Sequence, residues 1–142
     1  GWAELENFLR SYIYENNVEL HVLTGPILND DLDKIDKSIN QMSLPNFFYK
    51  IAIDFNNNRS IGFIMPNKKL DYPLEYYVTS IDSIESVSNL DFNYQLEDSI
   101  ENYLERLIDI SEWQTKKRKG NVVPISPNLL KKKEFNTFLW RK

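Results

Sequence analysis

The 142-residue chain contains no cysteine, which excludes disulfide bonds, thiol catalysis, iron–sulfur clusters and zinc–thiolate sites. It contains a single histidine, His21, so one copy of the chain cannot form a two-histidine zinc site, and a Ser-His-Asp triad would have to use His21 itself. The four glycines lie too far apart for the known glycine-rich phosphate-binding loops. Acid–base chemistry and metal binding on this chain therefore depend mainly on carboxylates.

Long hydrophobic runs are also absent. No stretch of about 18 apolar residues occurs, and we therefore expect no membrane-spanning helix. Hydrophobic residues make up 42% of the chain and charged residues 27%, a composition typical of a globular protein with a moderate core. The length fits one domain, since single domains usually contain roughly 100 to 200 residues.

Charge is divided unevenly along the sequence. Residues 1–114 contain 8 basic and 20 acidic side chains, a net charge of −12, whereas residues 115–142 contain 9 basic and 1 acidic, a net charge of +8. We therefore divide the chain into a folded part, residues 1–114, and a basic C-terminal arm, residues 115–142. The arm begins with the basic residues Lys116, Lys117, Arg118 and Lys119. These side chains could bind phosphates with release of counterions. Alternatively, they are solvated and complement the acidic body.

Three segments have the features of amphipathic helices. Apolar side chains in residues 2–15 and 95–112 recur every three or four positions, which places them in one stripe on each helix. Residues 81–88 form a third predicted helix, because serine and threonine just before it can act as its N-cap. The stripes contain Trp2, Leu5, Leu9, Tyr12 and Ile13 in the first helix and Leu96, Ile100, Tyr103, Leu104, Leu107 and Ile108 in the last.

Three further segments are predicted strands because they are rich in branched and aromatic residues. They are residues 18–24, 47–55 and 60–65, with a short extended piece at 76–78. The first strand alternates apolar and polar residues, and Gly25-Pro26 is expected to stop it. The second and third flank the turn residues 56–59, which predicts an antiparallel hairpin.

These elements predict an α+β fold in which an antiparallel sheet is flanked by helices. His21 lies on the face of its strand opposite Val18, Leu20 and Val22, so we expect a surface or sheet-edge residue and not a catalytic base. The connection at residues 29–44 is expected to be irregular or to contain a short helix. It has four aspartates but lacks the glycine and the twelfth-position glutamate of an EF-hand loop, so the sequence does not favour a calcium site.

Glu6 and Arg10 are four positions apart in the first predicted helix, so they share one helical face with the acidic group N-terminal. They are close enough to pair with each other or to converge on one phosphate. As an ordinary surface ion pair they would contribute only about 0.3 to 0.5 kcal/mol. The two residues alone do not decide between these interpretations.

Six short motifs occur in the order and at the spacing of one known family. They are Trp2-Ala3-Glu4-Leu5-Glu6 followed by Arg10, then Val22-Leu23-Thr24-Gly25-Pro26, Leu44-Pro45-Asn46-Phe47-Phe48-Tyr49-Lys50, Ile64-Met65-Pro66-Asn67, Val78-Thr79-Ser80-Ile81-Asp82-Ser83-Ile84-Glu85 and Leu90-Asp91-Phe92. Together they resemble the DNA/RNA non-specific endonuclease family over about residues 2–113. Such an ordered set is far more specific than any one motif.

The resemblance implies a ββα-metal (His-Me finger) nuclease that cleaves single- and double-stranded DNA and RNA with one divalent cation, usually Mg²⁺. It implies that Glu6 is catalytic and binds the cation through water, and that Arg10 is catalytic and binds nucleic acid by neutralising the scissile phosphate. These roles suit the side chains, because a carboxylate polarises cation-bound water and a guanidinium donates to phosphoryl oxygens. A periplasmic, extracellular or mitochondrial location would be compatible with the resemblance.

Two functional residues of the family have no counterpart on this chain. They are the general-base histidine of an Asp-Arg-Gly-His motif and the metal-binding asparagine a few positions before the tryptophan matched by Trp2. His21 cannot be the motif histidine, because it lies in the strand before Thr24-Gly25-Pro26. We therefore expect the C-terminal half of a nuclease domain, completed by an N-terminal segment of the same nuclease or by a separate chain.

Two alternatives remain open at this point. The chain could be a degenerate, non-catalytic relative that acts as a structural or nucleic-acid-binding subunit. The basic arm could also bind nucleic acid or an acidic partner without any cleavage.

The chain departs from the family pattern once more at Ser88-Asn89, where the family often has Thr-Gly. Asparagine can adopt the left-handed conformation that glycine supplies, so we expect the turn there to persist.

Overall fold

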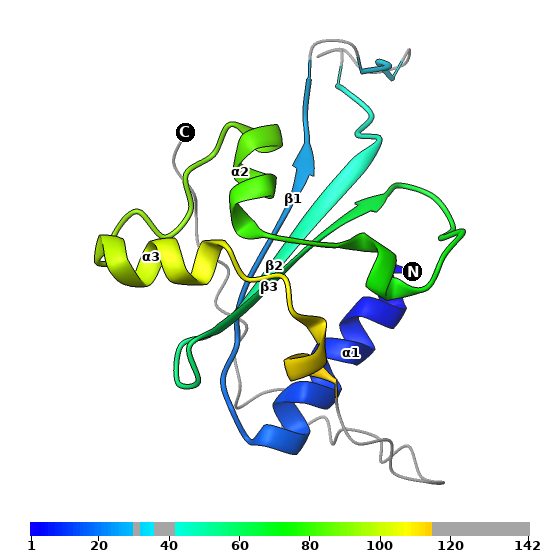
Figure 1. The fold of residues 1–142 in the computed structure, drawn as a ribbon. Helices are drawn as coiled ribbons and strands as arrows, with labels where there is room; N and C mark the ends of the chain where they lie inside the picture. Colours follow the sequence, from blue (N-terminus) through cyan, green and yellow to red (C-terminus); the bar gives the residue numbers. More distant parts are fainter. Residues whose placement is uncertain (30–31, 36–41, 115–142) are drawn as a thin grey trace, which may run out of the picture.

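The structure, a computed structural model, describes residues 1–29, 32–35 and 42–114. These residues form a four-stranded antiparallel sheet with the order β1-β2-β3-β4, and helices cover its faces (Figure 1). The predicted α+β class, an antiparallel sheet flanked by helices, is therefore confirmed. The basic arm, residues 115–142, lies outside the described residues, and so do its candidate nucleic-acid-binding side chains.

Helix α1 (Trp2–Asn16) confirms the first predicted helix. Its apolar stripe buries Leu5, Leu9 and Tyr12 in a core shared with the sheet. The helix ends at Asn17, whose φ of 51° lies in the left-handed region, where asparagine is tolerated better than most residues. Burial of the stripe fixes which side of α1 faces away from the core.

Strands β2 (Phe47–Asp54) and β3 (Arg59–Pro66) form the predicted antiparallel hairpin. Its turn contains Asn58, with a φ of 51°. Strand β4 (Val78–Thr79) pairs with β3 and follows a 3-10 helix, Leu74–Tyr77. The prediction of an extended segment at residues 76–78 is therefore wrong at residues 76 and 77, which belong to the 3-10 helix.

Strand β1 (His21–Ile27) corrects two expectations, because it begins three residues later than predicted and continues through Gly25 and Pro26. Glycine is required at position 25, because a Cβ there would collide with the hydroxyl of Tyr49 on β2. Pro26 is tolerated because β1 is an edge strand, so only one side of the strand needs backbone donors. The two residues shape the strand here and do not end it.

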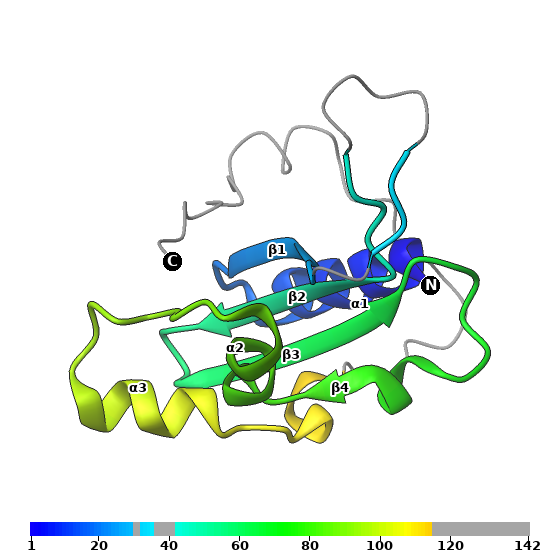
Figure 2. The same cartoon turned by 90° about the horizontal axis from the view of Figure 1, so that it is seen from above.

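The two faces of the sheet pack against different helices, since alternate residues of a strand point to opposite sides. On one face, α1 packs with Ala52 and Phe63 in a core that also contains Trp113. On the other, helices α2 (Ile81–Ser88) and α3 (Asp98–Glu105) pack over Tyr49 and Ile51. The strands lie between α1 and α2 in Figure 2. Even-numbered β2 residues therefore belong to the α1 face.

Helix α2 confirms the predicted helix at 81–88. Its N-cap is Ser80, whose Oγ accepts the backbone N–H of Ser83 at 3.1 Å. Asn89 ends the helix with a φ of 56°, which is the left-handed turn expected in place of the family's glycine.

The single helix predicted at 95–112 is wrong, because the structure divides this segment in two. Helix α3 ends at Glu105, and a separate 3-10 helix, Ile110–Trp113, follows. Asp109 is extended and its carboxylate accepts the N–H of Ser111 at 2.8 Å, so it starts a new helix and does not continue the old one. This break brings Trp113 under α1, where its ring centroid lies 4.4 Å from that of Tyr12.

The connection predicted to be irregular at 29–44 is described only in part. Lys34 and Ser43 form an isolated antiparallel bridge there, and the Lys34 ammonium donates to Ser43 Oγ at 2.7 Å. Among the residues that the structure describes, every helix is too short or too polar to span a membrane.

Candidate functional site

Glu6 and Arg10 lie on one flank of α1, next to the buried stripe that holds the helix on the sheet. Both side chains are half-buried. Trp2 precedes Glu6 by one further helical repeat of four residues, so the three side chains form a row along α1. The four-residue spacing of the motif therefore places an indole, a carboxylate and a guanidinium in one row along the helix.

Glu6 forms its ion pair with Lys50 of β2. The Lys50 ammonium donates to Glu6 Oε1 and lies 4.7 Å from the centroid of the Trp2 ring. The side chain of Lys50 is only 6% exposed, whereas that of Glu6 is 29% exposed. No ion pair joins Glu6 to Arg10 within the described part of the chain, so the interpretation of these two residues as an ordinary surface pair is wrong.

Lys50 ends one of the six motifs, but it was not among the candidate site residues predicted from the sequence. It lies on the even-numbered, α1-facing side of β2, opposite Thr24 on β1 and Phe63 on β3. A usable signal was present, because Lys50 is the one charged residue in the apolar run 47–53. A lysine inside such a strand is buried only where a partner compensates its charge.

Arg10 has one polar atom that is buried without a partner. Its Nε makes no hydrogen bond within the described residues. A buried unpaired donor is costly, and most buried polar groups in native proteins are satisfied by protein atoms, water or a ligand. The guanidinium therefore has hydrogen-bonding capacity that an anion could use.

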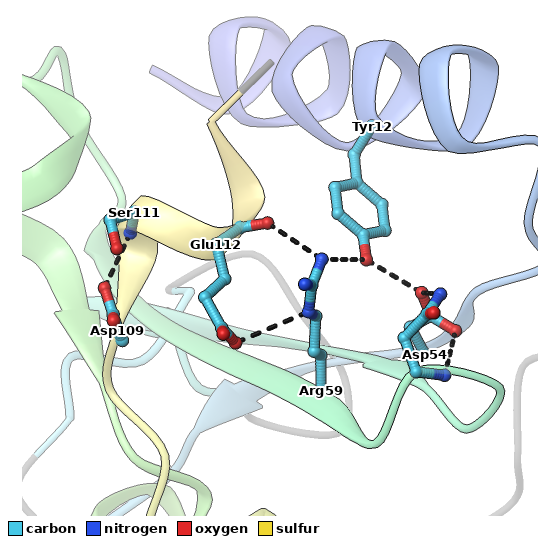
Figure 3. A network of polar contacts seen from close by, with 7 residues as sticks. Tyr12, Asp54, Arg59, Asp109, Ser111 and Glu112 are labelled. Atoms are coloured by element: carbon cyan, nitrogen blue, oxygen red, sulfur yellow. Dashed lines mark hydrogen bonds and ion pairs between the residues drawn. The ribbon is translucent and has the colours of Figure 1, made fainter.

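A polar network anchors the C-terminal half of α1 (Figure 3). The Tyr12 hydroxyl donates to Asp54 Oδ2 at 2.7 Å, and Asp54 is completely buried. Asn57 donates to the same carboxylate through its backbone N–H and its Nδ2. Arg59 Nη1 donates to the Tyr12 hydroxyl at 3.4 Å and to the backbone oxygen of Glu112 at 3.2 Å. The network ties α1 to the β2–β3 turn and to the last 3-10 helix, and it was not foreseen from the sequence.

A cluster of carboxylates lies on the other face of the sheet. One ligand oxygen from each of Asp82, Glu85 and Glu105 falls within 4.8 Å of the others, a grouping that could hold a metal ion. Glu105 is 7% exposed, and burial together with the nearby Glu85 carboxylate raises its pKa to about 8. Burial also raises the pKa of Glu85, although the N–H of Phe92 donates to it at 2.7 Å. A cation bound there would have to displace a proton from Glu105, so its affinity would rise with pH.

His21 lies on the edge strand β1, as expected, where its ring contacts that of Phe55 with centroids 4.8 Å apart. In the sheet register His21 pairs with Ile53 of β2, whereas Thr24 pairs with Lys50. His21 is therefore distant from the row of side chains on α1.

The chain is similar to known proteins in sequence and in fold. The sequence model of the DNA/RNA non-specific endonuclease family matches residues 1–99. Among curated proteins there is no match. Among solved structures, the chain is similar to that of an EndoG/EndoGI complex described as giving the mechanism of EndoG inhibition, with a TM-score of 0.53 and 24% identity. The likeness covers 68% of this chain and 44% of that chain, so the present chain spans less than half the length of this relative. At this level of identity the likeness concerns the fold.

Proposed function

Because the chain belongs to the DNA/RNA non-specific endonuclease family, we propose that it is part of a divalent-metal-dependent endonuclease that hydrolyses phosphodiester bonds in DNA and RNA without sequence preference. Mg²⁺ is the cation we expect. One observation carries the proposal: Glu6 and Arg10 share one side of α1, and each keeps an atom without a hydrogen bond in the described residues, Oε2 of Glu6 and Nε of Arg10.

Glu6 is proposed to hold a water molecule of the hydrated cation. Its carboxylate suits this role, because Lys50 occupies Oε1 while Oε2 makes no hydrogen bond within the described residues. Hydrated Mg²⁺ usually keeps several of its waters and is held through one or two carboxylates. When bound, a divalent cation supplies charge stabilisation to the oxygen that leaves phosphorus.

Arg10 is proposed to bind the phosphate that is attacked. Its guanidinium carries a fixed positive charge and several donors, which match the geometry of phosphoryl oxygens. Negative charge on these oxygens increases as water attacks phosphorus in line with the leaving oxygen, so a donor already in place stabilises the transition state more than the ground state. The partly buried setting of Arg10 strengthens this interaction by limiting its hydration.

The groups that this chain lacks are proposed to come from an N-terminal segment of the same nuclease or from a separate chain. That segment would contribute the histidine that takes a proton from the attacking water and the asparagine that binds the cation. The present residues 1–114 would then be the C-terminal part of the nuclease domain, with Glu6, Arg10 and most of the core.

The basic arm, residues 115–142, is proposed to add contacts to phosphates through Lys116, Lys117, Arg118 and Lys119. Binding of this kind releases counterions and therefore weakens steeply as salt rises. Deletion of residues 115–142 should reduce both the affinity for DNA or RNA and the slope of affinity against salt concentration. Equal salt slopes for the intact and shortened proteins would contradict this part of the proposal.

A second candidate function is binding without cleavage, which the net charge of +8 on residues 115–142 favours. In this alternative the chain is a degenerate relative that binds nucleic acid or stabilises an assembly without cleaving. The two candidates differ in one measurement, which is Mg²⁺-dependent nicking of plasmid DNA by the full-length protein. A protein that binds DNA but never nicks it in Mg²⁺ would favour the degenerate relative.

The decisive variants are Glu6→Gln and Arg10→Met in the full-length protein. We expect cleavage to fall about 10- to 100-fold for Glu6→Gln and about 100-fold for Arg10→Met. Chelation with EDTA should abolish cleavage by the unmodified protein. Glu4→Gln and Arg106→Met are the matched controls, because both side chains are exposed and lie outside the proposed site. Normal cleavage by Glu6→Gln and Arg10→Met would exclude the proposed roles.

A further inference from the structure

We propose that Lys50 is a positioning residue that holds Glu6 in the orientation in which it binds a cation through water. The inference rests on the proposed function and extends it, since it adds to the site a residue from the sheet. Lys50 is separated from Glu6 by 44 positions, so helical spacing cannot reveal the pair.

The first step concerns why the Lys50 ammonium is buried. It lies in β2, where every residue from Tyr49 to Asp54 is buried, and only 6% of its side chain is exposed. An ammonium taken out of water needs a compensating partner. Lys50 has two partners, the Glu6 carboxylate on one side and the face of the Trp2 ring on the other. The burial of the Lys50 ammonium therefore depends on Glu6 and Trp2.

The second step concerns which partner holds the other. Lys50 lies in the middle of a hydrogen-bonded sheet, paired with Thr24 of β1 and Phe63 of β3, so its backbone is fixed on both sides. Glu6 lies on a helix surface and is 29% exposed, and a free glutamate there would sample several rotamers. The rigid member of the pair is Lys50, and the side chain that loses freedom is Glu6.

The third step concerns the two oxygens of Glu6. Lys50 holds Oε1, and Oε2 makes no hydrogen bond within the described residues. With one oxygen engaged and its charge compensated by the ammonium, the carboxylate is poorly suited to chelate a bare cation. It is well suited to accept a hydrogen bond from a water of a hydrated cation. Lys50 thus favours binding of the cation to Glu6 through a water molecule over direct coordination by Glu6.

The test replaces Lys50 by Met in the full-length protein, because Met keeps the length and packs well against an indole ring. Partners that orient metal ligands typically affect affinity or activity about 10- to 100-fold. We therefore expect affinity for Mn²⁺ alone, measured by calorimetry, to fall about 10-fold. In nicking assays kcat should fall by a similar factor, while the KM for DNA changes less than about twofold, since Lys50 does not touch nucleic acid in this proposal.

Two controls separate positioning from loss of charge and from loss of structure. Lys69→Met removes one positive charge from an exposed site and should leave Mn²⁺ affinity unchanged. In the Glu6→Gln background, Lys50→Met should change Mn²⁺ affinity by less than about twofold, because its effect acts through the Glu6 carboxylate. Should Lys50→Met fail to fold, Lys50→Gln serves in its place, since the shorter neutral amide cannot hold Glu6 in the same way.

The outcomes distinguish this inference from the proposed function. If the unmodified protein binds Mn²⁺ and nicks DNA while the folded Lys50 variant does both equally well, the role of Lys50 is excluded and the proposed function stands. An effect of Lys50→Met that persists undiminished in Glu6→Gln would also exclude it. If the unmodified protein neither binds Mn²⁺ nor nicks DNA, both proposals fail together.

Discussion

On the α1 face of the sheet, the buried ammonium of Lys50 lies against the Glu6 carboxylate, whereas on the α2 and α3 face the buried carboxyl group of Glu105 lies close to another acid, Glu85. Both faces bury an ionisable side chain that is less than 8% exposed. They differ in the sign of the nearest neighbour. An opposite charge compensates Lys50, whereas burial and, after it, the like charge of Glu85 raise the pKa of Glu105 to about 8.

This difference separates two ways of burying an ionisable group. A counter-ion compensates a buried charge, and the α1 face therefore carries an ion pair. Next to a like charge the protonated form of a buried acid has the lower free energy. Glu105, on the α2 and α3 face, therefore keeps a proton near neutral pH. The proposed site lies on the face where the buried ammonium has a carboxylate as its partner.

The largest expected effect comes from removing the titration of Glu105. A glutamate in the unfolded chain has a pKa near 4.5, and the folded value is about 8. Between these two pH values the native state keeps a proton that the unfolded state has lost, so the free energy of unfolding decreases as pH rises from about 4.5 to about 8. Glu105→Gln should remove this decrease and be more stable than the unmodified protein by about 2 to 4 kcal/mol at pH 9.

Urea unfolding at pH 5, 7 and 9 measures this difference. Glutamine keeps an acceptor for the amide of Asn93, which donates to Glu105 Oε1 at 3.3 Å, so little else changes. Glu97→Gln is the matched control, because it removes an exposed acid from the same segment. Parallel stability curves for the unmodified protein and Glu105→Gln would show that Glu105 is ionised throughout, and the contrast between the two faces would disappear.

A smaller effect is expected from the other buried acid, Asp54, which lies on the α1 face. Its carboxylate is completely buried but accepts hydrogen bonds from Tyr12 and from Asn57. Tyr12→Phe removes one donor and leaves the ring in place, which should lower the free energy of unfolding by about 1 to 3 kcal/mol. Tyr14→Phe, on an exposed part of α1, is the control. No loss in Tyr12→Phe would mean that water or Arg59 replaces the donor, and that Asp54 does not depend on α1.

Local chemistry explains how much of the fold was predictable. The amphipathic stripe of α1, the hairpin of β2 and β3 and the Ser80 cap of α2 all follow from neighbouring residues, and all three are confirmed. The errors arise where tertiary context overrides a local signal. Gly25 and Pro26 are accommodated inside an edge strand, and Asp109 breaks a helix that apolar periodicity alone would continue.

The site was predictable only along the helix. Glu6 and Arg10 are marked by their four-residue spacing and by the motif around Trp2. Their surroundings come from distant parts of the chain, since Lys50 and the Tyr12–Asp54 contact join α1 to β2 across more than 40 positions. No local pattern reports such contacts. The sequence therefore indicated the proposed row of site residues but not the residues that contact it.

The smallest predicted effect is an asymmetry within the ion pair itself. Glu6→Gln leaves the ammonium of Lys50 buried without its counter-ion, whereas Lys50→Met leaves a carboxylate that is 29% exposed and can be hydrated. We therefore expect Glu6→Gln to cost about 1 kcal/mol more in the free energy of unfolding than Lys50→Met, with Glu4→Gln close to zero as the exposed control. Urea unfolding of the three variants at one pH measures the order. A larger loss for Lys50→Met would mean that its cation–π contact with Trp2 outweighs the ion pair, and that the α1 face does not bury its charge through Glu6.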